Sequence, residues 1–504
     1  MSFDAHQMDN VLLISAVVML VAILAVRVSV RAGLPSLLIY LMMGVLLGEA
    51  GVGIEFEDAN VAHALGFAAL VLILAEGGLT TQWTEIKPSM KLGVSLATVG
   101  VTVSVTVVAV GAHYLFGLEW QLAVLLGAVT SPTDAAAVFS VLRRVPLPRA
   151  LTGALEAESG LNDAPTVLLV TLVSTGAALD HGVLGFVGIV VYELVMGVLL
   201  GLAVGFGGAW VMRRVALPSS GLYPLAVLSL TILAYAGTAA LHASGFAAVY
   251  TAALVLGNSE LPHRAATRSF SEGVAWLAQI GLFVMLGLLV SPGRIEPHHV
   301  VIAALAGLLL TFVARPLSVL ACWFAHRLSL REQVFISWAG LRGAVPIVLA
   351  TIPLAEEVAD AEELFDIVFV MVVIYTLVTG PTLPLVARRL QVMHRGEARD
   401  LEVEAAPLER VAADLLQVSI TPRSRLHGVE VGELRLPVGS SVSLVVREGR
   451  TLVPDQRTVL RRGDDVLVVT PRRLREATED RPRRAGTPTT AASPRWSGPP
   501  CRAS

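Results

Sequence analysis

Thirteen long apolar runs occupy most of the first 390 residues, and they limit what this chain can fold into more than any other feature. A helix needs about 20 apolar residues to cross the hydrocarbon core of a bilayer. Only 15% of the 504 residues are charged, against about 25% in soluble proteins. Residues 1–390 are therefore predicted to form an all-α polytopic membrane domain. The predicted spans are 10–29, 34–49, 61–80, 92–116, 120–142, 153–177, 184–211, 222–241, 244–257, 272–291, 298–325, 332–353 and 364–387.

Charges in the connections between the runs predict the orientation. One alternate set of connections is basic and the other is acidic, with Arg294 as the single basic exception in the acidic set. Basic loops stay on the cytoplasmic side of a membrane. We therefore expect the N-terminus outside and the C-terminus in the cytoplasm, which requires an odd number of spans.

The hydropathy falls after Arg389. Residues 400–471 contain short alternating apolar segments separated by turns, a pattern typical of a small cytoplasmic α/β domain. Residues 472–504 are rich in Arg, Pro, Thr, Ala and Ser and are predicted to be a disordered basic tail. Such a tail either touches anionic lipid or is solvated without a role. The cysteines, Cys322 and Cys501, provide no disulfide framework.

Inside the fifth and sixth runs, Asp134, Glu158 and Asp163 lie within about 30 residues of one another. A carboxylate at the centre of a spanning helix costs roughly 2.5 to 3.5 kcal/mol on insertion scales, so these acids are expected to serve an ion or a proton. Ser159 and Asp163 share one helix face, and Glu158 shares the adjacent face with Asn162.

Oxygen donors of this kind suit K⁺ or Na⁺ better than a transition metal. We therefore expect a monovalent cation site near Asp163 and Asp134, where the two acids compete for proton and cation. Thr133 and Ser159 would add oxygens. The alternative is a neutral Asp163 that only hydrogen-bonds neighbouring helices together.

Two predicted spans are broken. Pro132 interrupts the fifth, and residues 340–346, a Gly-Leu-Arg-Gly-Ala-Val-Pro stretch, interrupt the twelfth. Either break alone is typical of a kinked packing helix. If the seventh span is a linker, however, the breaks occupy the same place in two six-helix halves of opposite orientation. That is the inverted-repeat pattern of transporters, which bind their cargo where broken helices meet.

Other charged residues inside the spans are weighed in the same way. Arg315 needs a buried anion, and Glu158 is the expected partner. Glu76 is a candidate for the cytoplasmic mouth of the pathway or a simple interfacial acid. Arg342, inside the second break, is a further candidate for a gate or pathway residue. Glu193 is given no role.

Together these residues resemble the NhaP-type cation/proton antiporters. The resemblance rests on Glu-Ser-Gly-Leu-Asn-Asp at 158–163, on Gly-Leu-Arg-Gly-Ala at 340–344 and on Arg315-Pro316. It implies thirteen helices in inverted repeats, a homodimer, and alternating access by a moving core of helices four to six and eleven to thirteen. It also implies that Asp163 is the exchanging acid beside Asn162, that Glu158 pairs with Arg315, and that exchange is one-for-one and electroneutral.

One departure bears on the cation. Many relatives have Asp-Pro in the fifth helix, whereas this chain has Ser131-Pro132 and carries its acid at Asp134. The stretch 133–139 is similar to the potassium/proton branch of the family.

Residues 408–470 resemble the C-terminal half of the RCK/TrkA regulatory modules of potassium transport. No Gly-x-Gly-x-x-Gly precedes them, so the nucleotide-binding half is missing. A small regulator at 400–471, such as a cyclic dinucleotide or another nucleotide, and dimerisation alone are equally compatible with this segment.

The sequence thus predicts a K⁺ or Na⁺/H⁺ antiporter of the cytoplasmic membrane, with no cofactor and no nucleic-acid partner. A regulated potassium channel is the first alternative, but a Thr-Val-Gly-Tyr-Gly-like filter is missing from the sequence. A membrane enzyme is the second, but neither His-Glu-x-x-His nor Gly-x-Ser-x-Gly occurs.

Overall fold

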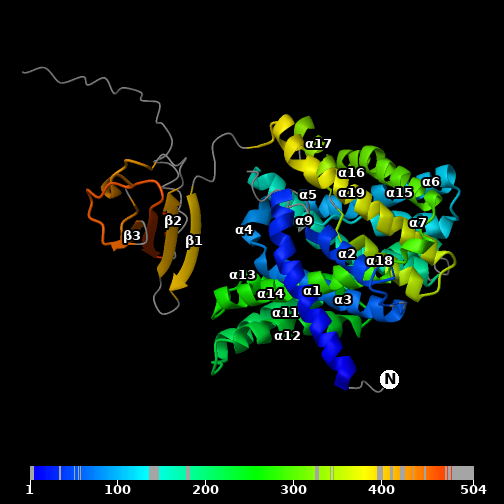
Figure 1. The fold of residues 1–504 in the computed structure, drawn as a ribbon, viewed down its shortest axis with the longest axis horizontal. Coiled ribbons are helices and arrows are strands. Elements are labelled where there is room, and N and C mark those ends of the chain that lie inside the picture. The colour runs from blue at the N-terminus through cyan, green and yellow to red at the C-terminus, as the bar shows by residue number, and fades with distance from the viewer. Residues whose placement is uncertain are drawn as a thin grey trace, which may run out of the picture. The chain divides into compact units, whose positions relative to one another are not determined.

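The chain divides into two units, Met1–His394 and Arg395–Ser504, each treated separately below (Figure 1). The predicted tail beyond residue 478, the second half of the fifth predicted span and residues 341 and 344 lie outside the described part. The computed structural model describes residues 5–32, 36–49, 51–54, 56, 58–134, 147–176, 182–323, 328–340, 342–343, 345–393, 401–408, 413–420, 426–434, 436–447, 450–471, 474 and 478.

The described part of the first unit contains one helical segment for each predicted span. Seven helices there are long and apolar enough to cross a membrane, and five shorter apolar helices accompany them. The remaining span is α9 (Arg149–Ser174), which has 26 residues and carries the buried acids. The predicted polytopic helical fold is confirmed.

These helices pack into two groups. In the first, which we call the scaffold bundle, α13 packs against α3, α11 and α12, while α14 packs against α2 and α3. The scaffold bundle consists of α1 (Ala5–Ala32), α2 (Ser36–Leu47), α3 (Ala59–Thr80), α11 (Gly182–Arg214), α12 (Leu222–Ala239), α13 (Gly245–Asn258) and α14 (Arg264–Leu289).

The second group, the core bundle, is centred on α9, which packs against α5, α7 and α18. The other members are α4 (Trp83–Ile86), η1 (Lys87–Ser89), α5 (Met90–Ser95), η2 (Leu96–Gly100), α6 (Val101–Phe116), α7 (Trp120–Thr130), α15 (Pro297–Leu309), η4 (Leu310–Ala314), α16 (Arg315–Ala321), α17 (Leu330–Trp338), α18 (Val345–Ala355) and α19 (Ala361–Arg389). A short 3-10 turn, η3 (Pro292–Arg294), precedes α15. These are the helices of spans four to six and eleven to thirteen.

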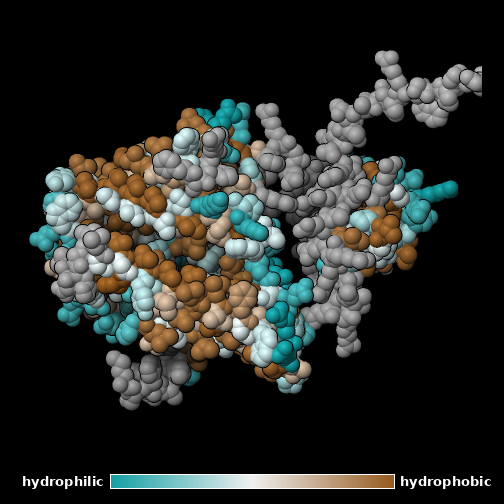
Figure 2. All heavy atoms as spheres, turned by 180° about the vertical axis from the view of Figure 1, so that it is seen from behind, coloured by the Kyte–Doolittle hydropathy of each residue, from teal (hydrophilic) through white to brown (hydrophobic). Residues whose placement is uncertain are grey.

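The outer surface of the first unit is apolar, as a lipid-facing surface must be. Apolar side chains cover much of the face in Figure 2, with hydrophilic residues gathered toward its edges. In the most apolar part of α11 only 11% of residues are buried, against 67% for α19. The linker span α11 therefore lies at the periphery, and α19 lies inside the core bundle.

Both predicted breaks are present. α7 ends at Thr130, and Ser131, Pro132 and Thr133 are not helical. The hydroxyls of Thr130 and Ser131 donate to the carbonyls of Leu126 and Gly127, both at 2.6 Å, so side chains satisfy carbonyls near the helix end. α17 and α18 are likewise separated by residues of which 340, 342 and 343 are described as non-helical.

A second pair of irregularities was not predicted. Spans four and eleven each contain a π-turn, η2 and η4, and these spans are again seven apart. α16 packs on η2, and α6 packs on η4. A π-turn holds an extra residue within an α-helix and is frequent at functional sites. Arg315 is the residue that directly follows η4.

Two spans begin well before their predicted starts. α14 begins at Arg264 rather than at residue 272, because its first turns carry arginines and lower the local hydropathy without ending the helix. Span four likewise begins with α4 at Trp83, ahead of the predicted residue 92.

The second unit contains an antiparallel sheet of strand order β1-β2-β5-β3-β4 with a 3-10 helix, η6 (Val431–Leu434). Alternate residues of the central strand β5 are buried, including Val466 and Val468, which explains its alternating sequence. The strands are β1 (Leu401–Leu408), β2 (Ala413–Ile420), β3 (Ser441–Arg447), β4 (Arg450–Leu452) and β5 (Asp465–Pro471).

Candidate functional site at the helix breaks

Glu158 on α9 and Arg315 on α16 form a bidentate ion pair inside the core bundle. The Arg315 Nη1 and Nη2 atoms donate to Glu158 Oε1 and Oε2 at 2.5 and 2.8 Å. Both side chains are at most 2% exposed. Two fork-like hydrogen bonds of this kind are among the strongest that proteins make. Each group therefore neutralises the other, and both carboxylate oxygens of Glu158 are already bonded to Arg315.

Asn162 and Asp163 lie beside the first break. The Asn162 amide donates to Thr133 Oγ1 at 3.0 Å, which orients its carbonyl oxygen away from that contact. Within the described residues, Asn162 Oδ1 and Asp163 Oδ1 are buried without a hydrogen-bond partner. Buried acceptors are normally satisfied, so two such oxygens on neighbouring residues indicate a place for a cation or a proton.

Asp134 completes this cluster from the other side. A Cβ atom on Gly343 would overlap the Asp134 carboxylate, so that carboxylate lies directly against the second break. Asp134 is also close enough for its charge to act on Asp163. Ser159 is half-buried one helical turn before Asp163. The candidate cation ligands expected from the sequence therefore gather where the two breaks meet.

Arg342 joins the two breaks. It is fully buried, and its Nε and Nη2 atoms donate to the carbonyls of Thr130 and Ser131 at 2.9 and 3.2 Å. Its Nη1 atom donates to the carbonyl of Gly340 in its own break. A guanidinium that bonds carbonyls of both interrupted segments fixes their crossing and adds a positive charge beside the acids.

Tyr250 was not expected from the sequence. It lies on α13 in the scaffold bundle, is 4% exposed, and packs on Gly160 of the core bundle so closely that a Cβ there would overlap its ring. Tyr250 therefore marks a direct contact between the bundles beside Asp163.

Glu76 lies on α3 in the scaffold bundle and is half-buried. The Thr80 hydroxyl donates to its backbone carbonyl at 3.0 Å, and Arg268 and Glu272 are the charged groups that act on its carboxylate. Glu76 therefore lies near the start of α14 and near the ends of α3 and α13.

The basic exception Arg294 is explained by a buried acid. Arg294 Nε and Nη2 donate to the two carboxylate oxygens of Asp366 at 2.7 and 2.9 Å, and Asp366 is fully buried on α19. Nη1 also donates to Glu362 at 3.1 Å. Arg294 therefore supplies the counter-charge that a buried carboxylate requires.

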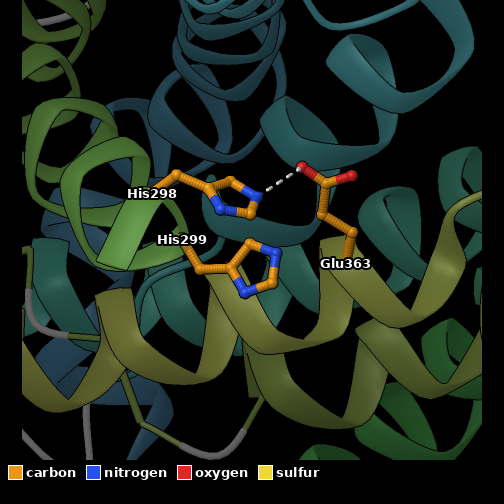
Figure 3. Close-up of side chains that lie close together, drawn as sticks. All are labelled: His298, His299 and Glu363. Carbon is orange, nitrogen blue, oxygen red and sulfur yellow. Dashed lines mark ion pairs between the residues drawn. The ribbon is translucent and has the colours of Figure 1, made fainter. Parts of the chain in front are cut away.

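A histidine pair lies next to this arginine. Figure 3 shows His298 and His299 at the start of α15 with Glu363 of α19, and the Nε2 atom of His298 is 3.8 Å from a Glu363 oxygen. The Nδ1 atom of His299 accepts the backbone N–H of Glu296 at 3.2 Å. That bond leaves the proton of a neutral ring on Nε2, the nitrogen a metal would need. We assign His299 to helix capping.

The comparisons with known proteins agree with this geometry. The family model for the transmembrane part of sodium/hydrogen exchangers matches residues 16–389, and the model for the TrkA-C domain matches residues 415–481. The chain is 34% identical to "K(+)/H(+) antiporter NhaP" of Alkalimonas amylolytica, over 91% of this chain and 80% of that protein. It is also 34% identical to "K(+)/H(+) antiporter NhaP2" of Shewanella sp. (strain ANA-3), over 92% and 82%.

A solved structure shares the fold. The sodium proton antiporter MjNhaP1 from Methanocaldococcus jannaschii, at pH 8, superposes with a TM-score of 0.66 at 21% identity, over 76% of this chain and 99% of that one. The match of a whole-domain family model, the relatives and the shared fold lead to one conclusion. This chain belongs to the sodium/hydrogen exchanger family and carries a C-terminal TrkA-C domain.

Proposed function

We propose that this protein is a secondary active antiporter that exchanges K⁺ for H⁺ across the cytoplasmic membrane. The observation that carries the proposal is the pair of buried, unpartnered acceptors Asn162 Oδ1 and Asp163 Oδ1 where the helix breaks meet. The names of the relatives support potassium as the cation.

The charged side chains at the crossing of the two helix breaks support one-for-one exchange. Arg315 and Arg342 are positive, and Glu158, Asp134 and Asp163 are negative when ionised. The five groups leave one net negative charge, which a single proton or a single monovalent cation neutralises. An uncompensated buried charge is strongly unfavourable, so the site is stable when loaded with either and unfavourable when empty. A carrier with this property changes conformation when a proton or a cation is bound and does not do so when the site is empty.

The side chains then have distinct roles. Asp163 holds the proton or faces the cation, Asp134 adds the second carboxylate, and Asn162, Thr133 and Ser159 contribute oxygens. Arg342 holds the crossing, and the Glu158–Arg315 pair keeps the other buried acid neutralised. Alternating access consists of the core bundle moving against the scaffold bundle, with Glu76 at the cytoplasmic mouth.

Further assignments follow from the loop charges and the domain match. The N-terminus lies outside and the C-terminus in the cytoplasm. The apolar scaffold surface provides the contact of a homodimer, and residues 400–471 form a regulatory domain that responds to a small molecule.

Proton release from everted vesicles tests the function. Vesicles with an acid interior that contain this protein release protons when K⁺ is added, and the Asp163→Asn variant releases none. Parallel additions of Na⁺ and Li⁺ give the cation preference. Glu193→Gln, a half-buried acid on the peripheral helix α11, is the matched control and retains exchange.

Two results would contradict the proposal. Proton release by Asp163→Asn at the normal rate removes Asp163 from the exchange. Potassium flux without proton movement assigns the protein to the regulated channels.

A further inference from the structure

Glu156 is an acid on α9 that the candidate site at the helix breaks does not include. Its side chain is half-buried. Within the described part of the chain, the charged group that acts on the Glu156 carboxylate is another acid, Glu85 of α4. A carboxylate inside a membrane protein is costly unless a cation or a proton accompanies it, and a second acid nearby adds to this cost. Because neither acid neutralises the other, both attract a passing cation or proton.

Three acids lie at increasing depth on α4 and α9. Glu85 is exposed, Glu156 is half-buried and Asp163 is 8% exposed. α4 packs directly on α9, since a Cβ on Gly153 would lie 2.8 Å from the backbone oxygen of Glu85. Glu156 follows Gly153 by almost one helical turn and precedes Asp163 by two, so it shares a face of α9 with both. The series ends at Asp163 Oδ1, which is buried without a hydrogen-bond partner among the described residues.

Tyr250 lies between the second and the third of these acids. Its ring packs on Gly160, which is on the same face of α9 between Glu156 and Asp163. Both carboxylates act on its phenol group, which is also hydrogen-bonded to the side chain of Thr81 at the end of α3. The ring therefore separates the two acids in this structure. A cation passes from one acid to the other when the core bundle moves against the scaffold bundle.

We propose that Glu156 draws K⁺ from the cytoplasm toward Asp163, as an acid of the entrance rather than of the binding site. The inference rests on the proposed antiport and on the proposed orientation, which places the start of α9 at the cytoplasmic surface. An acid in a path lined by low-dielectric protein raises the local concentration of cations.

The size of the effect follows from the spacing of the two acids. Two helical turns separate them by about 10 Å along α9. With an effective dielectric constant between those of a protein surface and of water, one charge at that distance enriches a cation at Asp163 roughly three- to tenfold. Glu156 thus serves the access of the cation, whereas Asp163 binds it.

The dependence of exchange on the K⁺ concentration tests the proposal. Everted vesicles present the cytoplasmic face to added K⁺. Glu156→Gln raises the K⁺ concentration for half-maximal proton release by roughly three- to tenfold. The maximal rate stays within about twofold of the wild type, because abundant K⁺ reaches Asp163 unaided. Glu156→Asp, which keeps the charge, retains the wild-type half-maximal concentration. Vesicles of the opposite orientation separate access from folding, because K⁺ then reaches Asp163 from the outer face. There Glu156→Gln leaves the half-maximal K⁺ concentration unchanged, whereas a general structural defect would raise it on both faces.

Glu193→Gln, the same substitution at a half-buried acid of the peripheral helix α11, is the matched control and changes the half-maximal concentration on neither face. The proposal is overturned if Glu156→Gln keeps the wild-type value on the cytoplasmic face, if the increase is equal on both faces, or if Glu156→Asp is impaired as strongly. Loss of exchange by Glu156→Gln at every K⁺ concentration would also overturn it, because Glu156 would then belong to the binding site. Each of these results leaves the antiport proposal standing as long as the wild type exchanges and Asp163→Asn does not. A wild-type protein that releases no protons with any added cation would overturn both.

Discussion

At the scale of single residues, the site depends on which buried charges are matched. Both carboxylate oxygens of Glu158 accept from Arg315, whereas Asn162 and Asp163 each keep an acceptor oxygen without a partner in the described chain. All four side chains are buried. What separates a structural ion pair from a candidate transport site is therefore hydrogen bonding rather than burial.

Removing one member of the ion pair should be worse than removing both. Glu158→Gln leaves the Arg315 guanidinium buried without its counter-charge, and we expect it to destabilise the protein by roughly 3–5 kcal/mol. The double variant Glu158→Leu with Arg315→Met should recover most of that loss. Thermal unfolding of the purified protein measures both.

The control is Glu362→Gln, which breaks the more exposed contact of Arg294 and should cost no more than about 1 kcal/mol. A double variant as unstable as Glu158→Gln would show that the two residues are not energetically coupled.

At the scale of elements, the crossing of the breaks depends on contacts that no local pattern encodes. Arg342 bonds carbonyls more than 200 positions earlier in the chain. The sequence showed that residues 340–346 break a helix and that an arginine lies in the break. It carried no signal that this arginine binds the other break, so Arg342 was predicted to be a gate or pathway residue.

The same reasoning explains the other features that were missed. In the sequence, Tyr250 looks like an ordinary residue on the apolar face of a short span. Only the fold brings it to Gly160. Asp366 did carry a signal: a buried acid near the start of span thirteen and a lone arginine in an acidic loop predict an ion pair. The thirteen spans were predictable because each is an apolar run, whereas the start of α14 was not because its first turns are charged.

In the second unit, a buried acid connects the start of β5 to the end of β3. Asp464 precedes β5, and its side chain is fully buried while that of Arg447 on β3 is 23% exposed. Burial alone would raise the pKa of Asp464, but hydrogen bonds from Arg447 and the backbone of Arg461 outweigh burial and lower this pKa below its ordinary value of 3.8. The ionised form is therefore the one that stabilises the fold.

This predicts a pH-dependent effect of Asp464→Asn. A lowered folded-state pKa gives stability that is complete above the unfolded pKa and is lost as pH falls through the folded value. At pH 7 the variant should lose roughly 1–3 kcal/mol of local stability, and the difference from the wild type should shrink below about pH 4. Hydrogen exchange of β3 and β5 amides in the full chain, compared as protection factors, measures it. A difference that stays constant down to pH 3 would contradict the assignment.

At the scale of the whole molecule, the helices form two bundles whose contact surface passes beside the site. Gly160 of the core bundle faces Tyr250 of the scaffold bundle, and a Cβ there would overlap the tyrosine ring. Movement of one bundle on the other must slide across this contact. The spacing of the bundles therefore limits the motion that the proposed transport cycle requires.

Gly160→Ala should reduce exchange in vesicles by at least tenfold, because the added methyl group must push the bundles apart or block their sliding. Gly281→Ala, in a helix where a Cβ meets nothing within 4 Å, is the control and should exchange normally. The combination of Gly160→Ala with Tyr250→Leu should regain activity. Full activity of Gly160→Ala by itself would mean that the contact opens freely.

The one-for-one exchange proposed from the charges where the helix breaks cross has a consequence for the energetics of transport. A loaded carrier that is neutral with either a proton or a potassium ion crosses no net charge, so the membrane potential, worth about 2.3 kcal/mol per charge at 100 mV, does no work on it. Only the two concentration gradients then matter. At equilibrium the potassium ratio across the membrane equals the proton ratio, so each pH unit across the membrane holds about a tenfold potassium gradient. A cell using such a protein would lose potassium whenever the outside became more acidic than that ratio allows.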